Sequence, residues 1–227
     1  GAELVRAGAL PPLVHMVGAG AGAGSAKGAA ELAAAAAATL GALGTSHEQR
    51  LQIASARGVA VLLRCLVDGT DRSVQEPACA ALRALCLSGT ACAQVAGSAD
   101  LDSIVGLLTR GDAQLREAAA GLLGTVALHP QGRSRALATS AVPALVKLLP
   151  LRHEPTQEAA ARAIRNLALD PDGLAQVTKA GGMQPLVRLL QSRSEGLHGA
   201  AAAALEVLTM DAAHRDELLQ SLPALPT

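Results

Sequence analysis

The sequence predicts an all-α solenoid of stacked helical units. The first indication is a repeated sequence pattern of branched apolar residues, as in KAGGMQPLVRLL (179–190) and ATSAVPALVKLL (138–149). Equivalent residues follow one another at steps of 49, 42, 41 and 41: Leu13, Leu62, Ile104, Leu145 and Leu186. The second indication is an Ala-rich segment in every period, with apolar residues at helical spacing. A fixed period near 40 residues is typical of arrays whose small helical units share one core.

Each period predicts three helices. A short first segment ends near glycine or serine, an apolar second segment follows, and a polar loop leads to a long Ala-rich third segment. Proline is tolerated in the first turn of a helix, where its missing N–H has no intrahelical partner. Pro12, Pro143 and Pro185 therefore predict the starts of three second helices. Gly8 and Gly181, just before two of them, predict a sharp change of direction.

The repeats predict one continuous domain, residues 1–227. Its expected units are 1–46, 47–88, 89–129, 130–170 and 171–211, with a partial sixth unit at 212–227. The first unit is longer than the others, which predicts a flexible Gly-rich insertion, Gly18–Gly28, between its second and third helices.

Two units depart from the pattern at the junction between first and second helices. Arg57 and Ala99 stand where glycine is usual, as at Gly8 and Gly181, and we expect Gly58 to shift the first of these kinks by one residue. Ser73, followed three residues later by Glu76, predicts a capping box at the start of the third helix of the second unit.

The composition excludes several classes of partner. The sequence has 19 Lys plus Arg and 19 Asp plus Glu, so a formal net charge of +0 provides no overall field for nucleic acid or an anionic membrane. The absence of Phe, Tyr and Trp removes the usual stacking platforms for single-stranded nucleic acid. The uncharged stretch 7–26 contains Pro11, Pro12 and several glycines, which disfavours a membrane span. We therefore expect a protein partner, no nucleic acid and no membrane insertion.

The chemistry-bearing residues show no catalytic or metal-binding pattern. Four cysteines lie in apolar helical stretches without paired zinc-ligand spacing, which predicts buried, reduced core thiols: Cys65, Cys79, Cys86 and Cys92. The six histidines are scattered, and GAGAGAGSAKG (18–28) lacks the Gly-Lys-Ser/Thr order of a phosphate loop. We expect no catalytic residue, no cofactor and no metal. Reduced thiols favour a cytoplasmic location, with nuclear, flagellar or cytoskeletal locations as alternatives.

The pattern resembles the armadillo repeat. A glycine kink, PLVRLL (185–190) on the second helix and QEAAARAIRNLA (157–168) on the third carry the resemblance, which is clearest over 130–211. It implies a right-handed α-solenoid of about five three-helix repeats plus a partial terminal repeat. The third helices would line a concave groove for an extended peptide or a partner helix. HEAT repeats are the structural rival, but they lack the short first helix and the Gly-x-x-Pro junction.

The resemblance also implies binding residues on the third helices. Importin-alpha adapters carry Trp and Asn ladders there. Here only Asn166 matches, with Thr125 at the equivalent position of the third unit, so a nuclear-import role is disfavoured. The remaining groove candidates are charged: Glu76, Arg83, Glu117, Glu158, Arg162, Arg165 and Glu206. Arginines beside an asparagine can hold a carboxylate and a peptide backbone together. Glu158 and Arg162, at i,i+4, can equally form a solvated pair within the helix.

These observations predict a non-catalytic protein–protein interaction scaffold or adaptor, monomeric in isolation. One alternative is the substrate-recruiting region of a larger ubiquitin ligase, because similar repeats follow a U-box in plant ligases. Another is a structural array of the flagellar or cytoskeletal kind. The recognition surface is predicted to be either the groove or the Gly18–Gly28 loop.

Overall fold

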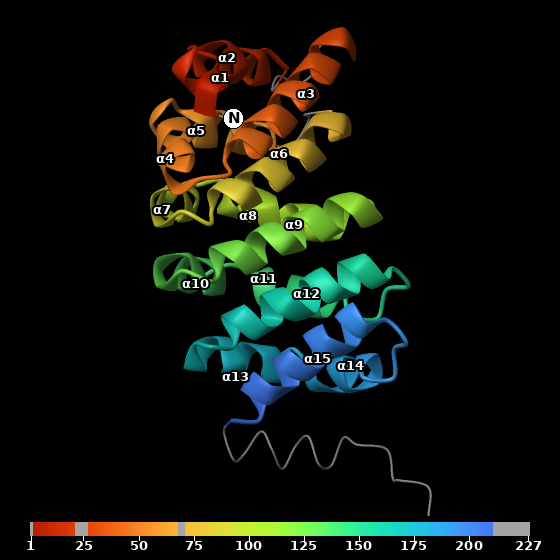
Figure 1. Ribbon diagram of the computed structural model, residues 1–227. Coiled ribbons are helices and arrows are strands. Elements are labelled where there is room, and N and C mark those ends of the chain that lie inside the picture. The colour runs from red at the N-terminus through yellow and green to blue at the C-terminus, as the bar shows by residue number, and fades with distance from the viewer. Residues whose placement is uncertain (1, 21–26, 68–70, 211–227) are drawn as a thin grey trace, which may run out of the picture.

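The computed structural model describes residues 2–20, 27–67 and 71–210. Within these residues the chain forms fifteen α-helices in five consecutive groups of three (Figure 1). The predicted partial sixth unit, 212–227, lies outside the described residues. Within the predicted Gly-rich insertion, Gly18–Gly20 belong to α2 and Lys27–Gly28 belong to α3. The rest of the insertion, 21–26, lies outside the described residues.

The three helices of each unit differ in length and place. The first helices are α1 (Ala2–Arg6), α4 (His47–Ser55), α7 (Gly89–Gly97), α10 (Pro130–Leu137) and α13 (Pro171–Lys179). The second helices are α2 (Leu10–Gly20), α5 (Gly58–Arg64), α8 (Leu101–Arg110), α11 (Ala141–Val146) and α14 (Met183–Leu189). The third helices are α3 (Lys27–Leu43), α6 (Arg72–Leu85), α9 (Ala113–Val126), α12 (Glu154–Leu167) and α15 (Glu195–Leu208).

The third helices form the spine of the molecule. Each packs directly on the third helix of the next unit, and each also packs on the second helix of its own unit. Figure 1 shows α3, α6, α9, α12 and α15 stacked in register along the long axis. We call the exposed surface of these five helices the third-helix face. Behind it, one continuous apolar core runs from Leu10 to Leu208.

Proline and glycine act at the junctions as predicted. Pro12, Pro143 and Pro185 all lie in the first turn of a second helix, in α2, α11 and α14. Gly8 and Gly181 adopt left-handed φ values of 80° and 72°, where an L side chain would be strained.

The kink of the second unit differs from the prediction. Arg57 itself adopts the left-handed conformation, with φ 62°, and Gly58 is the first residue of α5. A Cβ at Gly58 would lie 2.6 Å from Ile53 Cγ2 and 2.8 Å from the Ile53 carbonyl oxygen. Glycine is therefore required at position 58 for close packing, and the expected one-residue shift of the kink is wrong.

The cap of α6 also differs from the prediction. Its N-cap is Asp71, whose Oδ1 accepts hydrogen bonds from the backbone N (2.8 Å) and Oγ (2.7 Å) of Ser73. Ser73 therefore lies inside the helix and cannot cap it together with Glu76. A capping box forms instead at α4, where Ser46 and Gln49 bond to each other's backbone N–H.

All four cysteines are buried, as predicted. Burial raises the pKa of the Cys65 thiol to about 11 and that of Cys79 to about 12. Interaction with the neighbouring Cys92 thiol, together with burial, raises the pKa of Cys86. None of the helices in the described ranges combines the length and apolarity needed to cross a bilayer.

The strained Arg57 predicts a stabilising substitution. An L residue in the left-handed region costs roughly 1–2 kcal/mol, and glycine avoids most of that cost. We expect Arg57→Gly to raise the free energy of unfolding by about 1 kcal/mol in urea titrations. Gly181→Ala is the matched control, and it should lower that free energy by a similar amount. An Arg57→Gly protein no more stable than wild type would contradict the strain argument.

The buried thiols predict a loss of stability in alkali. An unfolded thiol ionises near pH 9, whereas Cys65 and Cys79 in the folded chain ionise near 11 and 12. Their contribution is complete below pH 9 and is lost as the pH rises toward 11–12, because the unfolded state then releases protons more readily. We expect the free energy of unfolding to fall between pH 9 and pH 11. This decrease in the free energy of unfolding should be shallower in the double variant Cys65→Ala/Cys79→Ala. An identical slope in the wild type and the variant would show that the two thiols do not cause the loss of stability.

Candidate functional site

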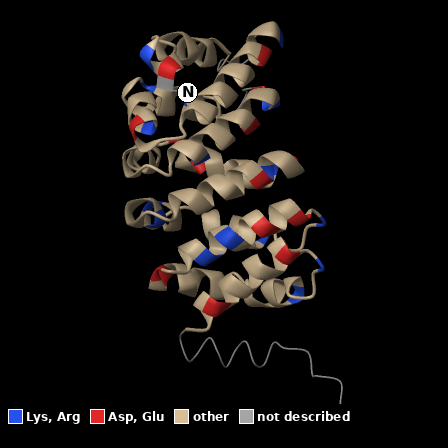
Figure 2. Cartoon of the chain, viewed as in Figure 1, with Lys and Arg blue, Asp and Glu red and all other residues tan. Residues whose placement is uncertain are grey.

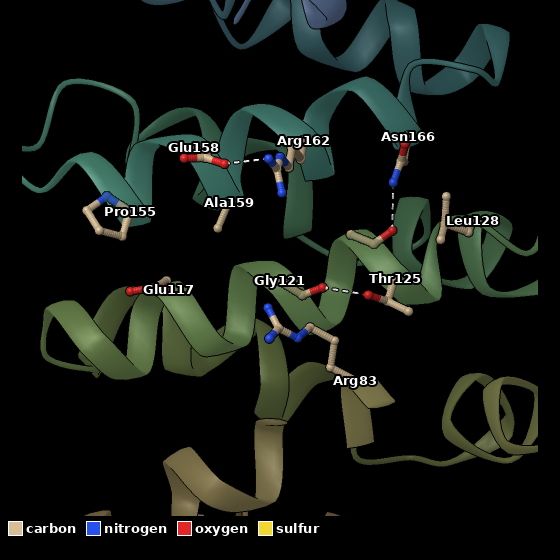
Figure 3. A pocket seen from close by; sticks show the side chains of 11 residues that line it. Arg83, Glu117, Gly121, Thr125, Leu128, Pro155, Glu158, Ala159, Arg162 and Asn166 are labelled. Carbon is tan, nitrogen blue, oxygen red and sulfur yellow. Dashed lines mark hydrogen bonds and ion pairs between the residues drawn. The ribbon is translucent and has the colours of Figure 1, made fainter. Parts of the chain in front are cut away.

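A cleft of about 250 Å³ opens on the third-helix face between α9 and α12 and extends to α6 (Figure 3). Its lining combines two cations, two anions, polar groups and a few apolar surfaces: Arg83, Glu117, Gly121, Gly124, Thr125, Leu128, Pro155, Glu158, Ala159, Arg162 and Asn166. Third helices of three successive units therefore build one site.

The centre of the cleft is shaped by a missing side chain. A Cβ at Gly121 on α9 would lie 3.1 Å from Nη1 of Arg83, which reaches across from α6. Figure 3 shows the guanidinium groups of Arg83 and Arg162 pointing toward the Gly121 segment from opposite sides. Glycine at position 121 thus leaves room for the guanidinium group of Arg83, which can donate several hydrogen bonds in a plane.

The acidic residues occupy one end of the cleft. Glu158 Oε1 lies 2.5 Å from Arg162 Nη2, and the Arg162 side chain is 65% exposed. The within-helix pair that the sequence allowed is therefore present, and an exposed i,i+4 pair contributes only about 0.3–0.5 kcal/mol. Glu117 makes no ion pair or hydrogen bond to any residue in the described part of the chain. Arg83 also has no ionic partner in that part of the chain. The cleft therefore contains one cation, Arg83, and one anion, Glu117, that are not paired within the protein.

The other end of the cleft is polar and apolar. Asn166 is buried, and its Nδ2 donates a hydrogen bond of 2.8 Å to the carbonyl oxygen of Gly124 on α9. Thr125 Oγ1 donates to the carbonyl oxygen of Gly121 in its own helix at 3.0 Å. One of the two N–H groups of the Asn166 amide therefore joins two units, and the expectation that Asn166 contacts a peptide backbone stays a prediction. Its carbonyl oxygen points away from α9 in Figure 3.

The structure brings together six of the nine residues that the sequence proposed. These six line the cleft: Arg83, Glu117, Thr125, Glu158, Arg162 and Asn166. Glu76, Arg165 and Glu206 are exposed on third helices but do not line it. Sequence reasoning missed Leu128, which is 52% exposed at the rim. Its signal was available, because an aliphatic residue follows the Ala-rich segment at the equivalent position of the next unit, Leu169.

Charge on the third-helix face is mixed. Figure 2 shows acidic and basic residues interspersed over α6, α9 and α12, with no large field of one sign. Among residues 2–20, 27–67 and 71–210, no three His, Cys, Asp or Glu side chains lie close enough together to hold a metal ion. The arrangement can form directional hydrogen bonds and ion pairs with a ligand that lies across several helices.

Comparison with protein families identifies the repeat. The model of the armadillo/beta-catenin-like repeat matches residues 46–87, 130–169 and 170–210, which is more than half of the chain. The chain belongs to the armadillo/beta-catenin-like repeat family. The matched segments coincide with the helix groups that start at α4, α10 and α13.

Solved structures agree with this fold. An engineered protein, 27% identical, superposes with a TM-score of 0.85 over 94% of this chain and 85% of that chain. A designed armadillo repeat protein in complex with the peptide (KR)4, 21% identical, has a TM-score of 0.81 over 93% of this chain and 87% of that one. A comparison of the sequence with curated proteins finds no significant match. The predicted right-handed α-solenoid of three-helix armadillo repeats is confirmed.

The hydrogen bond of Asn166 predicts a structural effect. Replacing Asn166 with alanine leaves the Gly124 carbonyl without its partner at a buried junction, which costs about 1–3 kcal/mol. We expect Asn166→Ala to lower the free energy of unfolding by that amount in urea titrations. Arg165→Ala is the matched control, because Arg165 is the exposed neighbour, and it should change stability by less than about 0.5 kcal/mol. Equal small effects in both variants would show that the Asn166 bond does not hold the units together.

Proposed function

We propose that this armadillo domain is a non-catalytic protein-binding scaffold that holds a segment of another protein along its third-helix face. The observation that carries the proposal is the cleft shared by α6, α9 and α12. A ligand in it contacts three units at once. Long surfaces shared by stacked repeats suit extended chains, because each repeat offers the same set of positions at a regular interval.

The polar groups of the cleft support this proposal. An extended segment has unpaired backbone N–H and C=O groups, which require partners when the segment is bound. Within the described residues, the Arg83 guanidinium at the centre of the cleft has no partner for its donors, and the Glu117 carboxylate at one end has no partner for its acceptors. A designed armadillo relative was solved with the peptide (KR)4, which supports peptide binding by this type of surface. Monomeric state and the absence of a nucleic-acid partner stay predictions.

The test compares charge reversal inside the cleft with charge reversal outside it. Peptides are first selected on the immobilised chain from a random display library and are then titrated by fluorescence anisotropy. Arg83→Glu/Arg162→Glu should weaken their binding by about tenfold or more, because each charge-assisted hydrogen bond contributes roughly 1.5–3 kcal/mol and 1.4 kcal/mol is tenfold. Circular dichroism confirms that each variant is folded.

The matched control is Arg64→Glu/Arg188→Glu. These two arginines are exposed on second helices and carry the same change of charge. We expect less than a twofold change in affinity. If both double variants lose affinity equally, the effect is non-specific, and if neither loses any, binding takes place away from the cleft. Either result would refute the proposal.

A further inference from the structure

A larger recess than the cleft lies away from the third helices. It is formed between α5 and α7, which pack on each other, and its volume is about 590 Å³, against about 250 Å³ for the cleft. Figure 1 shows α4, α5, α7 and α10 along one edge of the stack, near the C-terminal ends of the third helices. We call this recess the α5–α7 groove. It shares no lining residue with the cleft.

The floor of the groove is built from aliphatic and small residues. Val59 and Leu63 are buried beneath it, whereas Ala60 on α5 and Ala93 on α7 are exposed. Gly97, the last residue of α7, is also exposed, and a Cβ at this position would have no atom within 4 Å. The three exposed floor residues carry at most a methyl group, so the backbone of another chain can approach them closely.

An arginine stands at each end of α5. Arg57 precedes its first residue, Arg64 is its last, and both are exposed in the lining of the groove. They are seven residues apart, which is nearly two turns, so they lie on one side of α5 at about 10.5 Å along its axis. Neither makes an ion pair among residues 2–20, 27–67 and 71–210. Asp100, the N-cap of α8, is the single acidic residue in the lining.

The backbone of Arg57 is a separate indication of a binding role. This residue holds the left-handed conformation at φ 62°, which glycine would adopt without strain. Strained residues of this kind concentrate at ligand sites, where the side chain they present has a function. Because Arg57 forms no ion pair within the described residues, contacts of its charge inside the protein do not account for the strain.

The shape and charge of the groove favour an acidic helix as its occupant. A trough between two packed helices accommodates a third helix, whose apolar face can contact the small residues of the floor. Residues seven apart on that helix return to nearly the same side at about 10.5 Å, which matches the interval between Arg57 and Arg64. Carboxylates at these two places can each accept charge-assisted hydrogen bonds from one guanidinium. Asp100 disfavours a partner that is acidic throughout.

We propose that the α5–α7 groove binds an amphipathic helix of a partner protein that carries acidic residues at positions i and i+7 and aliphatic residues at i+3 and i+4. The carboxylates contact Arg57 and Arg64, and the aliphatic side chains contact Ala60, Ala93 and Gly97. This surface belongs to first and second helices. The inference is therefore independent of the cleft on the third-helix face and of the function proposed for it.

The test uses the full chain and a defined helical probe. The probe is a fluorescent peptide with three copies of Glu-Ala-Gln-Leu-Leu-Ala-Gln. One control peptide has Lys in place of Glu, and another has Pro in place of the first Ala of each copy, which breaks the helix. We expect the probe to bind about tenfold or more tightly than either control in fluorescence anisotropy titrations.

Each outcome of these titrations bears on one part of the proposal. Equal binding of the Pro peptide would overturn the helical conformation of the ligand. Equal or tighter binding of the Lys peptide would overturn its charge. A probe that the wild-type chain does not bind would overturn the proposal as a whole.

Two variants of the groove distinguish lost binding from lost folding. Arg57→Gly should weaken binding of the probe about tenfold while it stabilises the chain, so unfolding cannot explain the loss. Gly97→Leu places a side chain in the groove and should weaken binding by a similar factor. Gly199→Leu is the matched control, because a Cβ at this exposed glycine of α15 also has no atom within 4 Å, and it should change affinity less than twofold. Wild-type affinity in either groove variant would refute the site.

Charge reversal separates the groove from the cleft. Arg64→Glu/Arg188→Glu should weaken binding of the probe about tenfold, although peptides of the cleft bind this variant as they bind the wild type. Arg83→Glu/Arg162→Glu should bind the probe with wild-type affinity. If only the second variant loses the probe, the probe occupies the cleft and the groove is refuted. If the probe behaves as expected and the cleft peptides do not, the proposed function fails alone.

A second copy of the chain is the alternative occupant of the groove. We expect the wild type and Gly97→Leu to sediment alike, both as monomers. A wild-type dimer that Gly97→Leu converts to a monomer would show that another copy covers the groove, and it would overturn the proposal of a partner helix.

Discussion

The direct packing of one third helix on the next, through alanine and glycine, is the contact on which the rest of this structure depends. A Cβ at Gly41 on α3 would lie 2.9 Å from the Cα of Ala81 on α6, and a Cβ at Gly124 on α9 would lie 3.3 Å from the Cα of Ala163 on α12. Backbones approach this closely only where side chains are absent or small. The molecule can therefore build a continuous core without any aromatic residue, since leucine, valine and alanine fill what little space remains.

Polar side chains fix the register of the stacked units. Several of them reach a backbone carbonyl about one repeat earlier: Arg135 to Ala96 at 3.0 Å, Thr156 to Ala113 at 2.9 Å, Asn166 to Gly124 at 2.8 Å and Gln176 to Leu137 at 3.2 Å. Apolar packing alone is not directional, whereas a hydrogen bond to one carbonyl specifies one alignment. The Asn166 bond uses only one of its two amide N–H groups, so the residue that most resembles a family ligand contact also joins two units.

Features that depend on residues close in sequence could be predicted, whereas features that depend on contacts between distant residues could not. Periodicity, prolines in first turns and the glycine kinks at positions 8 and 181 are local features, and each was predicted from neighbouring residues. The left-handed conformation of Arg57 is not predictable from the sequence, because it depends on the close contact between Gly58 and Ile53, which only the fold brings about. Asn166 depends on a carbonyl 42 residues away, and although Leu128 stands at an aliphatic position that recurs at Leu169, only its burial shows that this position faces solvent.

The small-residue spine also sets the scale at which the third-helix face can bind a ligand. Because alanine and glycine bring the third helices close together, equivalent residues of successive units recur at the interval of two tightly packed helices. A spine built from leucine or phenylalanine would hold the helices further apart and would lengthen that interval. The buried alanines and glycines that pack the third helices together do not contact a ligand. They nevertheless determine the spacing of the exposed residues that do. A substitution in the buried spine is therefore expected to change which ligand spacing fits, even though no ligand touches it.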